Sequence, residues 1–303
     1  MEIEINIVKT VQKLSCGFMD SFMKIISLFG TVYFLIAIIL FMYYFIDKRY
    51  AINFGIAASV SICINLFLKN WIKRPRPYLH DNAIMQKADE MGYSFASGHS
   101  LVAANSAVAV IDRSKKDGKL KWWIILICVV FCVFVGFSRI YLGEHFLTDV
   151  VAGLFLGAFV TPFALKVVNK LVKDSYYQWL GLILAVAGFG LAFVFHKELL
   201  SDNQSIKTML ICGGALGAGL GLFLEFRFNK FELSNLTTHK HVWWVGLLAI
   251  CEIGVLLLVL LFLPKFGVVL YCYSAILSFF ATFVQSVIMK KIYIRLGVYG
   301  KNN

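Results

Sequence analysis

Long apolar segments separated by short polar ones make up most of the chain. A helix needs about 20 mainly apolar residues to cross the hydrocarbon core of a bilayer, and most of these segments approach or exceed that length. Their backbone groups must be hydrogen-bonded within the segment, and no alternating pattern suggests a barrel, so we expect helices. The pattern predicts nine spans, at residues 25–46, 51–68, 98–112, 122–142, 145–168, 179–196, 206–226, 241–263 and 268–292.

The composition supports a membrane protein. Of the 303 residues, 60% are hydrophobic and only 15% are charged, which lies far outside the usual range of a soluble domain. We therefore predict an all-α fold, a polytopic membrane helical bundle. Because Glu2 and Glu4 stand at the start and no small-residue cleavage site precedes the first span, a cleaved signal peptide is not expected.

Residues 1–24 have a different pattern, with apolar positions at helical spacing and polar residues between them. This pattern favours an amphipathic helix lying in the membrane interface, and a polar lead-in to the first span is the alternative. We accordingly divide the chain into an interfacial helix at 1–24, a membrane core at 25–196 and a C-terminal transmembrane extension at 197–303. The apolar positions of the first segment are Ile7, Val8, Val11, Leu14, Phe18, Met19 and Phe22.

Three polar clusters lie at the ends of predicted spans and on one side of the predicted membrane. They read K-x6-R-P, A-S-G-H and S-R-x5-H-x3-D. Phosphoryl transfer spreads negative charge over three oxygens, so it depends on positive charge and hydrogen-bond donors placed in advance, which clusters of this kind supply. The cluster residues are Lys69, Arg76, Ser97, Gly98, His99, Ser138, Arg139, His145 and Asp149.

The residue types in these clusters suggest separate roles. Three of them supply positive charge for a phosphate, namely Lys69, Arg76 and Arg139, and an arginine fork can hold two oxygens at once. Ser97 and Gly98 lie where the chain enters a helix, so their backbone N–H groups can face an anion, and a side chain at position 98 would block that approach.

The two histidines complete the predicted chemistry. His145 has Asp149 one helical turn later, a spacing at which the carboxylate can fix the imidazole tautomer, so we predict His145 to be the nucleophile. His99 is then the general acid that protonates the leaving alkoxide. No His or carboxylate lies at a useful spacing from the cysteines, so we expect no metal site.

The distribution of basic residues predicts the orientation. Under the nine-span arrangement the side with the clusters carries 12 Lys and Arg, or 9 when Lys69, Arg76 and Arg139 are set aside, against 17 on the other side. The positive-inside rule therefore places the clusters outside the cytoplasm, and the basic segment 112–121 marks the cytoplasmic side. The net charge of +12 is explained in this way without nucleic-acid binding. Few prolines and much Lys, Ile and Asn hint at a bacterium, and hence at its inner membrane with the site facing the periplasm or exterior.

The clusters resemble the three signature motifs of the type 2 phosphatidic acid phosphatase superfamily, over residues 69 to 149. The resemblance implies that Lys69, Arg76, Ser97, Gly98 and Arg139 bind phosphate, that His99 is the acid/base, and that His145 with Asp149 forms a phosphohistidine without a metal or other cofactor. One departure is Ala96, where members commonly have proline. The family core has about six spans, so the spans after residue 200 are expected to be an extension.

A site at the membrane boundary favours a lipid substrate, a lipid phosphate monoester or a prenyl pyrophosphate, whose chains stay among the helices. The alternatives are a lipid phosphotransferase, a glucose-6-phosphatase-like sugar phosphatase and a non-enzymatic transporter. Lys73, Arg74 and Lys87 are expected to be interfacial anchors, Glu144 to face water or a cationic head group, and the polar loop 78–95 to meet head groups. The repeat of Gly213, Gly217 and Gly221 is explained equally by packing within one chain and by a homodimer.

Overall fold

The computed structural model describes residues 2–88, 90, 92–194, 203–236, 241–259 and 267–300. Within these ranges the fold is helical, as predicted, and the single β-type contact is a bridge between Leu236 and Tyr299. The α-helices are α1 (Glu2–Gln12), α2 (Gly17–Leu28), α3 (Val32–Phe45), α4 (Lys48–Ile72), α5 (Pro77–His80), α6 (Gly98–Lys116), α7 (Trp122–Tyr141), α8 (Leu147–Leu171), α9 (Tyr177–Val194), α10 (Asn203–Leu224), α11 (Val242–Val259), α12 (Gly267–Phe279) and α13 (Gln285–Arg295). Short 3-10 helices occupy Asp174–Tyr176 and Leu233–Asn235, and π-helical turns occupy η3 (Glu225–Asn229) and η5 (Phe280–Val284).

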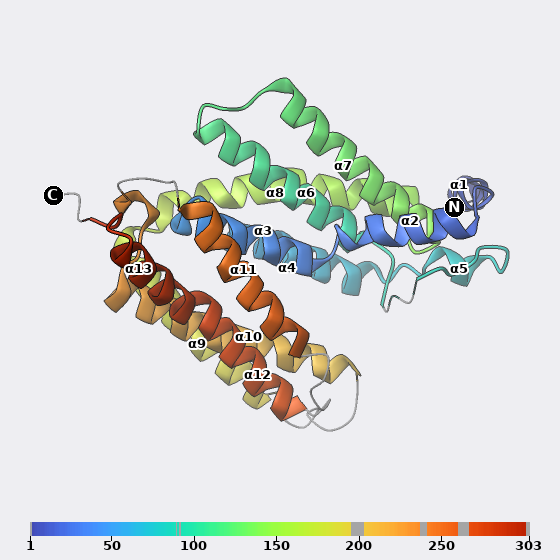
Figure 1. Ribbon diagram of the computed structural model, residues 1–303. Coiled ribbons are helices and arrows are strands. Elements are labelled where there is room, and N and C mark those ends of the chain that lie inside the picture. Colours follow the sequence, from blue (N-terminus) through green and yellow to red (C-terminus); the bar gives the residue numbers. More distant parts are fainter. Residues whose placement is uncertain are drawn as a thin grey trace. The chain divides into compact units, whose positions relative to one another are not determined.

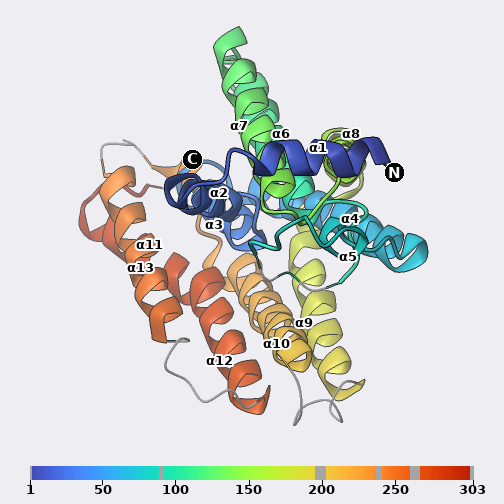
Figure 2. The same ribbon diagram turned by 90° about the vertical axis from the view of Figure 1, so that its right-hand side faces the viewer.

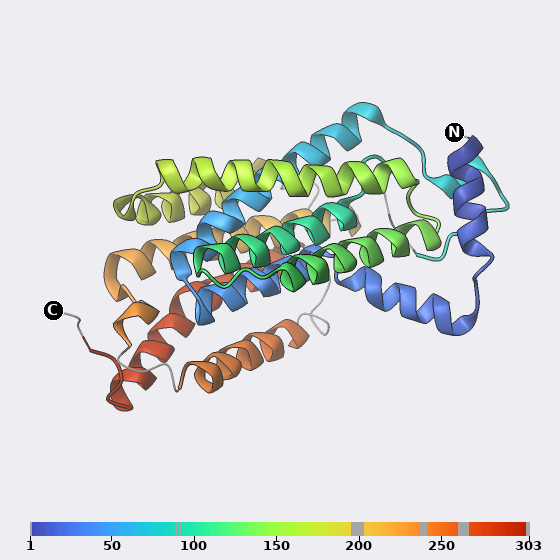
Figure 3. The same ribbon diagram turned by 90° about the horizontal axis from the view of Figure 1, so that it is seen from above.

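The chain forms two compact units. The first contains Met1–Leu40 and Arg49–Lys170, and the second contains Phe41–Lys48 and Leu171–Asn303. In the first unit α6 and α7 lie side by side (Figure 1). Helix α1 runs across the end of this unit, roughly perpendicular to α7 and α8 (Figures 2 and 3). An orientation of this kind suits a helix in the membrane interface, because its axis is crossed with the helices that run through the bilayer.

The predicted count of nine spans is not confirmed. Among the described residues, five helical segments are long and apolar enough to cross a membrane, or six if α2 and α3, which are bent by 48° at their junction, form one span. Helix α6, expected as the third span, does not qualify, and it buries the polar residues Ser100, Asn105 and Ser106 inside the unit. The five segments are Lys48–His80, Trp122–Tyr141, Leu147–Leu171, Met209–Asn235 and Val268–Arg295.

The N-terminal segment differs from the predicted single helix over 1–24. It consists of two helices, α1 and α2, separated at residues 13–16, and α2 leads on to α3 across the bend. Val8 of α1 is fully buried in a cluster with Ile84, Ile140 and Phe146, while Ile3 is largely exposed. Gln12 fixes the end of α1, since its side chain donates to the carbonyl oxygens of Met85 and Tyr141. The helix is therefore docked on the first unit through one face.

Close helix contacts in the first unit depend on glycine. A Cβ at Gly153 of α8 would lie 2.3 Å from the Ser97 carbonyl oxygen, and one at Gly157 would lie 2.7 Å from that of Leu101. Such distances are possible only without a side chain, so these positions set the separation of α8 from the start of α6.

In the second unit the predicted glycine repeat faces a neighbouring helix of the same chain. A Cβ at Gly213, Gly217 or Gly221 would collide with Tyr271, Ala275 or Thr282 respectively. Packing of α10 against α12 and η5 therefore accounts for the repeat, and the repeat gives no support to a homodimer.

A buried ionic network joins distant parts of the second unit. Lys48, which is 8% exposed, donates to Glu225 Oε1 at 2.7 Å and also to the Phe231 carbonyl oxygen. The other oxygen of Glu225 accepts from Asn229 Nδ2 at 2.6 Å and from the Ser286 hydroxyl. Both oxygens of the Glu225 carboxylate thus accept hydrogen bonds, as a buried ion pair requires.

The turn between α7 and α8 has room only for glycine at position 143. Gly143 has φ +76°, and a Cβ there would lie 2.5 Å from the Met85 carbonyl oxygen and 2.9 Å from Gln12 Nε2. Gly118 has φ +66°, but a Cβ there would meet nothing within 4 Å. Substitution of Gly118 by alanine therefore costs only the backbone strain of a positive φ, about 1 to 2 kcal/mol. Gly143→Ala is expected to lower the melting temperature in detergent more than Gly118→Ala. Equal losses would contradict the tight packing of this turn.

Candidate active site

The three predicted clusters meet at one end of the first unit. Helix α4 brings Lys69, the following loop brings Arg76, α6 begins at Gly98, α7 ends just after Arg139, and α8 begins just after His145. Lys73 ends α4 in a left-handed conformation, with φ +52°, and proline at positions 75 and 77 prevents the helix from continuing. The chain therefore turns back toward the other clusters as soon as it has passed Lys69.

Asp149 anchors the histidine end of the site. Its Oδ2 accepts from the Phe146 backbone N–H at 2.8 Å and from Ser94 Oγ at 2.5 Å, and lies 3.8 Å from His145 Nδ1. Ser94 Oγ also lies 3.4 Å from His145 Nδ1, so it stands between the carboxylate and the imidazole. With Nδ1 directed to this pair, Nε2 is the nitrogen left for chemistry. The sequence analysis did not single out Ser94, because a serine in an aperiodic loop has no distinctive signal.

Arg139 has an unused hydrogen-bonding edge although it is almost completely buried. Its Nη1 donates to Ser27 Oγ, its Nη2 lies 3.0 Å from Glu90 Oε1, and its Nε has no hydrogen-bond partner among the residues that the structure describes. A buried guanidinium N–H without a partner is costly and rare, so the Nε and Nη2 edge is suited to an incoming anion.

Arg76 is held from the other side. It donates through Nη1 to Glu144 Oε2 at 2.6 Å and through Nε to the Gly92 carbonyl oxygen at 2.9 Å. The expectation that Glu144 faces water or a head group is wrong: its side chain is 0% exposed and it pairs with Arg76. Burial raises the pKa of Glu144 to about 7, against the opposing effect of the Arg76 charge.

Glu90 lies among the predicted phosphate ligands. Its carboxylate oxygens are 3.0 Å from Arg139 Nη2, 3.3 Å from His99 Nε2 and 3.8 Å from Arg76 Nη2. Burial disfavours its charge, yet the charges around it, above all that of Arg139, keep the pKa of Glu90 below its usual value. A carboxylate thus lies at the point on which groups expected to bind a phosphate converge.

Lys69, Ser97 and Gly98 complete the surroundings. Lys69 Nζ donates to the carbonyl oxygen of Tyr93 at 2.7 Å, and its charge acts on both imidazoles. Ser97 caps α6 by accepting from the Ser100 backbone N–H at 3.3 Å. A Cβ at Gly98 would meet nothing within 4 Å, so packing does not demand glycine there. The roles of Ser97 and Gly98 in binding an anion stay predictions.

Both imidazoles favour the neutral form at physiological pH. Burial, reinforced by the Arg139 charge, lowers the pKa of His99 to about 4. Burial also lowers the pKa of His145 to about 3, although the contact with Asp149 opposes the shift. A neutral His145 has a free lone pair on Nε2, whereas His99 must gain a proton before it can serve as an acid. A bound anion near His99 favours that protonation.

The comparison with known sequences places this site in a family. The PAP2 superfamily pattern matches residues 50–173, which include every predicted site residue. Lipid A 4'-phosphatase of Porphyromonas gingivalis is 30% identical over 192 residues, covering 60% of this chain and 78% of that protein. The chain belongs to the PAP2 superfamily. The resemblance inferred from the three motifs is thereby confirmed.

Other relatives of this PAP2 protein match over shorter lengths. Phosphatidylglycerophosphatase B of Bacillus subtilis is 41% identical over 98 residues, which make up 31% of this chain and 46% of that protein. The match thus spans about half of that relative. The crystal structure of a transmembrane PAP2-type phosphatidylglycerolphosphate phosphatase from Bacillus subtilis is similar with a TM-score of 0.48 and 27% identity, over 57% of this chain and 87% of that one.

Removal of the Glu90 charge is expected to strengthen anion binding. In Glu90→Gln, orthophosphate no longer competes with a carboxylate for Arg139 and His99, so its dissociation constant should fall about 10-fold, equivalent to about 1.4 kcal/mol. The measurement is the rise in melting temperature in detergent as orthophosphate is added. Glu2→Gln, the same change at an exposed position of α1, is the control. Weaker binding by Glu90→Gln would contradict the competition.

Glu144 should make stability depend on pH. Its pKa is raised from 4.5 to about 7 by burial, so the folded chain holds a proton that the unfolded chain releases. This contribution is complete below pH 4.5 and is lost as pH rises through about 7. Glu144→Gln resembles the protonated form and lacks the dependence. The melting temperature of the wild type should therefore fall relative to Glu144→Gln between about pH 4.5 and about pH 8, and parallel curves would refute the shift.

Proposed function

We propose that this PAP2 protein is an integral-membrane, metal-independent phosphatase that hydrolyses lipid phosphate monoesters or prenyl pyrophosphates. The observation that carries the proposal is the convergence of Arg76, Arg139 and His99 on the single carboxylate of Glu90. A phosphate has the same kind of oxygen acceptors as a carboxylate and more charge, so this position suits a phosphoryl group once Glu90 leaves it.

The proposed reaction has two steps. Nε2 of His145 attacks phosphorus, the bond to the lipid alkoxide breaks, and His99 in its protonated form gives its proton to the leaving oxygen. Water then attacks the phosphohistidine, His99 takes up a proton from that water, and phosphate is released with His145 restored. Asp149 and Ser94 hold Nδ1 of His145 throughout, so the attacking nitrogen keeps its direction.

Arginine charge accounts for most of the expected rate acceleration. Once Glu90 has left, the Nε and Nη2 edge of Arg139 can bind two phosphoryl oxygens and Arg76 Nη2 can bind a third, while Lys69 adds a positive charge nearby. The two arginines are buried, and their interaction with the charge of the transition state is therefore little weakened by water.

A lipid substrate is supported by the relatives and by the place of the site. Their names refer to phosphatidylglycerophosphate, lipid A and undecaprenyl diphosphate, all of which are lipid phosphates. The site lies at the end of the first unit that α1 crosses, where a head group can enter while its chains stay in the bilayer.

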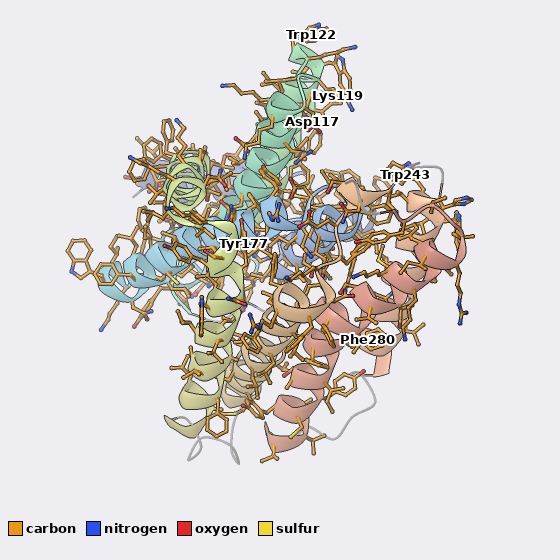
Figure 4. The ribbon with its side chains drawn as sticks, turned by 90° about the vertical axis from the view of Figure 1, so that its left-hand side faces the viewer. Asp117, Lys119, Trp122, Tyr177, Trp243 and Phe280 are labelled. Atoms are coloured by element: carbon orange, nitrogen blue, oxygen red, sulfur yellow. The ribbon has the colours of Figure 1, made fainter. Side chains whose placement is uncertain are left out.

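We further propose that the site faces the periplasm or exterior of a bacterial inner membrane. The loop that joins α6 and α7 lies at the opposite end of these helices, and Figure 4 shows Asp117, Lys119 and Trp122 together there. Basic residues in such a loop favour the cytoplasmic side, and a tryptophan favours the interface.

Loss of the proposed nucleophile should abolish turnover. His145→Ala is expected to lower phosphate release from phosphatidate by about 10³-fold or more, because no other group can form the covalent intermediate. The control is His241→Ala, which changes a histidine of the second unit that accepts from Trp244 Nε1 at 2.9 Å. Phosphate is measured with the detergent-purified protein, with and without a chelator. Full activity of His145→Ala would refute the mechanism.

Substrate and acceptor controls in the same assay separate the alternatives. Preference for water-soluble sugar phosphates would favour a glucose-6-phosphatase-like enzyme. Phosphorylation of an added alcohol would favour a transferase. Transport that persists after loss of both His99 and His145 would favour a transporter.

A further inference from the structure

Arg74 connects the catalytic carboxylate to the N-terminal helix. Its Nη1 lies 2.7 Å from Asp149 Oδ1, and its Nη2 lies 2.6 Å from Glu4 Oε2 in α1. Arg74 was expected to be an interfacial anchor, but its side chain is only 15% exposed and its guanidinium group is held between two carboxylates. Its Cζ atom also lies 4.1 Å from the centre of the Phe146 ring, next to the proposed nucleophile. Two carboxylates and one aromatic ring thus hold this guanidinium beside the site.

The two oxygens of Asp149 have separate partners. Oδ1 is taken by Arg74, whereas Oδ2 receives the Phe146 N–H and the Ser94 hydroxyl and faces His145. A carboxylate fixed at both oxygens cannot rotate about its terminal bond without losing a charge-assisted hydrogen bond. Arg74 therefore determines which oxygen faces the imidazole.

Glu4 in turn fixes Arg74. Besides its ion pair with the guanidinium, Glu4 Oε1 accepts from Thr148 Oγ1 at 2.6 Å and from the Thr148 backbone N–H at 3.2 Å. Arg74 Nη1 also donates to Thr148 Oγ1 at 2.7 Å. Glu4 and Arg74 thus enclose the residue that precedes Asp149 at the start of α8. The charges alternate from Glu4 to Arg74 to Asp149, so the Arg74 charge is offset and Asp149 keeps its attraction for the imidazole.

We propose that Arg74, held by Glu4 of α1, is the positioning residue of Asp149 and makes the N-terminal helix part of the catalytic apparatus. The inference rests on the proposed function, because it concerns the same histidine. Neither residue needs to touch the substrate: the Arg74 fork is already directed to the two carboxylates, whereas the unused guanidinium edge in the site belongs to Arg139.

The test compares kcat and KM for a short-chain phosphatidate. Arg74→Gln is expected to lower kcat on the order of 10- to 100-fold, the range for a misdirected catalytic group, with KM nearly unchanged. Glu4→Gln should lower kcat less, and the double variant should be no worse than Arg74→Gln, because the two residues act in series. Additive losses, or a loss confined to KM, would overturn the proposal.

The pH profile separates positioning from general stabilisation. His145 is surrounded by the charges of Asp149, Arg139, Lys69 and Arg76, and Glu90 also acts on it. Removal of the Arg74 charge lets Asp149 favour the protonated imidazole, so the acid limb of kcat/KM should move to higher pH in Arg74→Gln. Arg74→Lys keeps the positive charge but lacks the planar guanidinium group. The acid limb of its kcat/KM profile should therefore lie at the wild-type pH, whereas its kcat should stay low. An unmoved limb in Arg74→Gln would overturn the proposal.

A matched control addresses the docking of α1 itself. Lys9 lies on the same helix as Glu4 and pairs with Asp81, which follows α5. It has no contact with Asp149 in the described part of the chain. Lys9→Gln should retain wild-type kcat, and a loss equal to that of Glu4→Gln would show that any loosening of α1 suffices, against the proposal. Wild type and His145→Ala are assayed together: an inactive wild type would refute the proposed function as well, whereas an active wild type with an unaffected Arg74→Gln refutes the positioning role alone.

Discussion

The concentration of like charges at low exposure is the constraint on which the site depends. Arg76 and Arg139 are 2% and 1% exposed, and Lys69 acts electrostatically on the same surroundings. Removing guanidinium groups from water and bringing them together costs several kcal/mol per ion unless counter-charges are supplied. The fold supplies a carboxylate to each: Glu144 to Arg76 and Glu90 to Arg139, and it gives Arg74 both Asp149 and Glu4.

The carboxylates differ in how firmly they are held. Glu144 is buried beneath Arg76, and Asp149 is fixed by four groups, so both are permanent parts of the framework. Glu90 comes from the loop between α5 and α6 and is 27% exposed. The arginine charge is thus balanced in part by a carboxylate that is more exposed than Glu144 or Asp149. The carboxylates stabilise the buried arginines in the folded chain, and the site still attracts an external dianion.

The sequence predicted which residues gather at one end of the first unit better than it predicted the contacts that support them. Lys69, Arg76, His99, Arg139 and His145 were found because residues of their types recur at spacings that the phosphoryl-transfer reaction requires. Ser94 and Arg74 were not assigned to the site, because they reach Asp149 across 55 and 75 positions of the chain. Glu90 was expected only as part of the polar loop 78–95, and its contact with Arg139 likewise joins residues that are far apart in the sequence. No local pattern encodes such contacts. The all-α fold followed from hydropathy, but the span count did not.

Helix α6 gives a physical reason why the count of nine spans is not confirmed. Helix α6 carries Ser100, Asn105 and Ser106, which are satisfied inside the unit by hydrogen bonds such as that from Thr161 Oγ1 to Asn105 Oδ1 at 2.6 Å. A helix surrounded by other helices need not be apolar, so hydropathy alone cannot decide whether it crosses the membrane. The bend between α2 and α3 is likewise a tertiary feature, since an apolar run from 25 to 46 gives no sign of it.

The Lys48 network limits how the chain can be divided. Residues 41–48 lie between two segments of the first unit in the sequence, yet the ammonium group of Lys48 finds its counter-ion in Glu225, and the hydroxyls of Tyr43 and Tyr44 donate to carbonyl oxygens of Thr282 and Ala281. A shortened chain that stopped after α8 would keep the catalytic residues but would leave these groups without their acceptors. The residues after α8 therefore help to stabilise the connection between α3 and α4 through these hydrogen bonds.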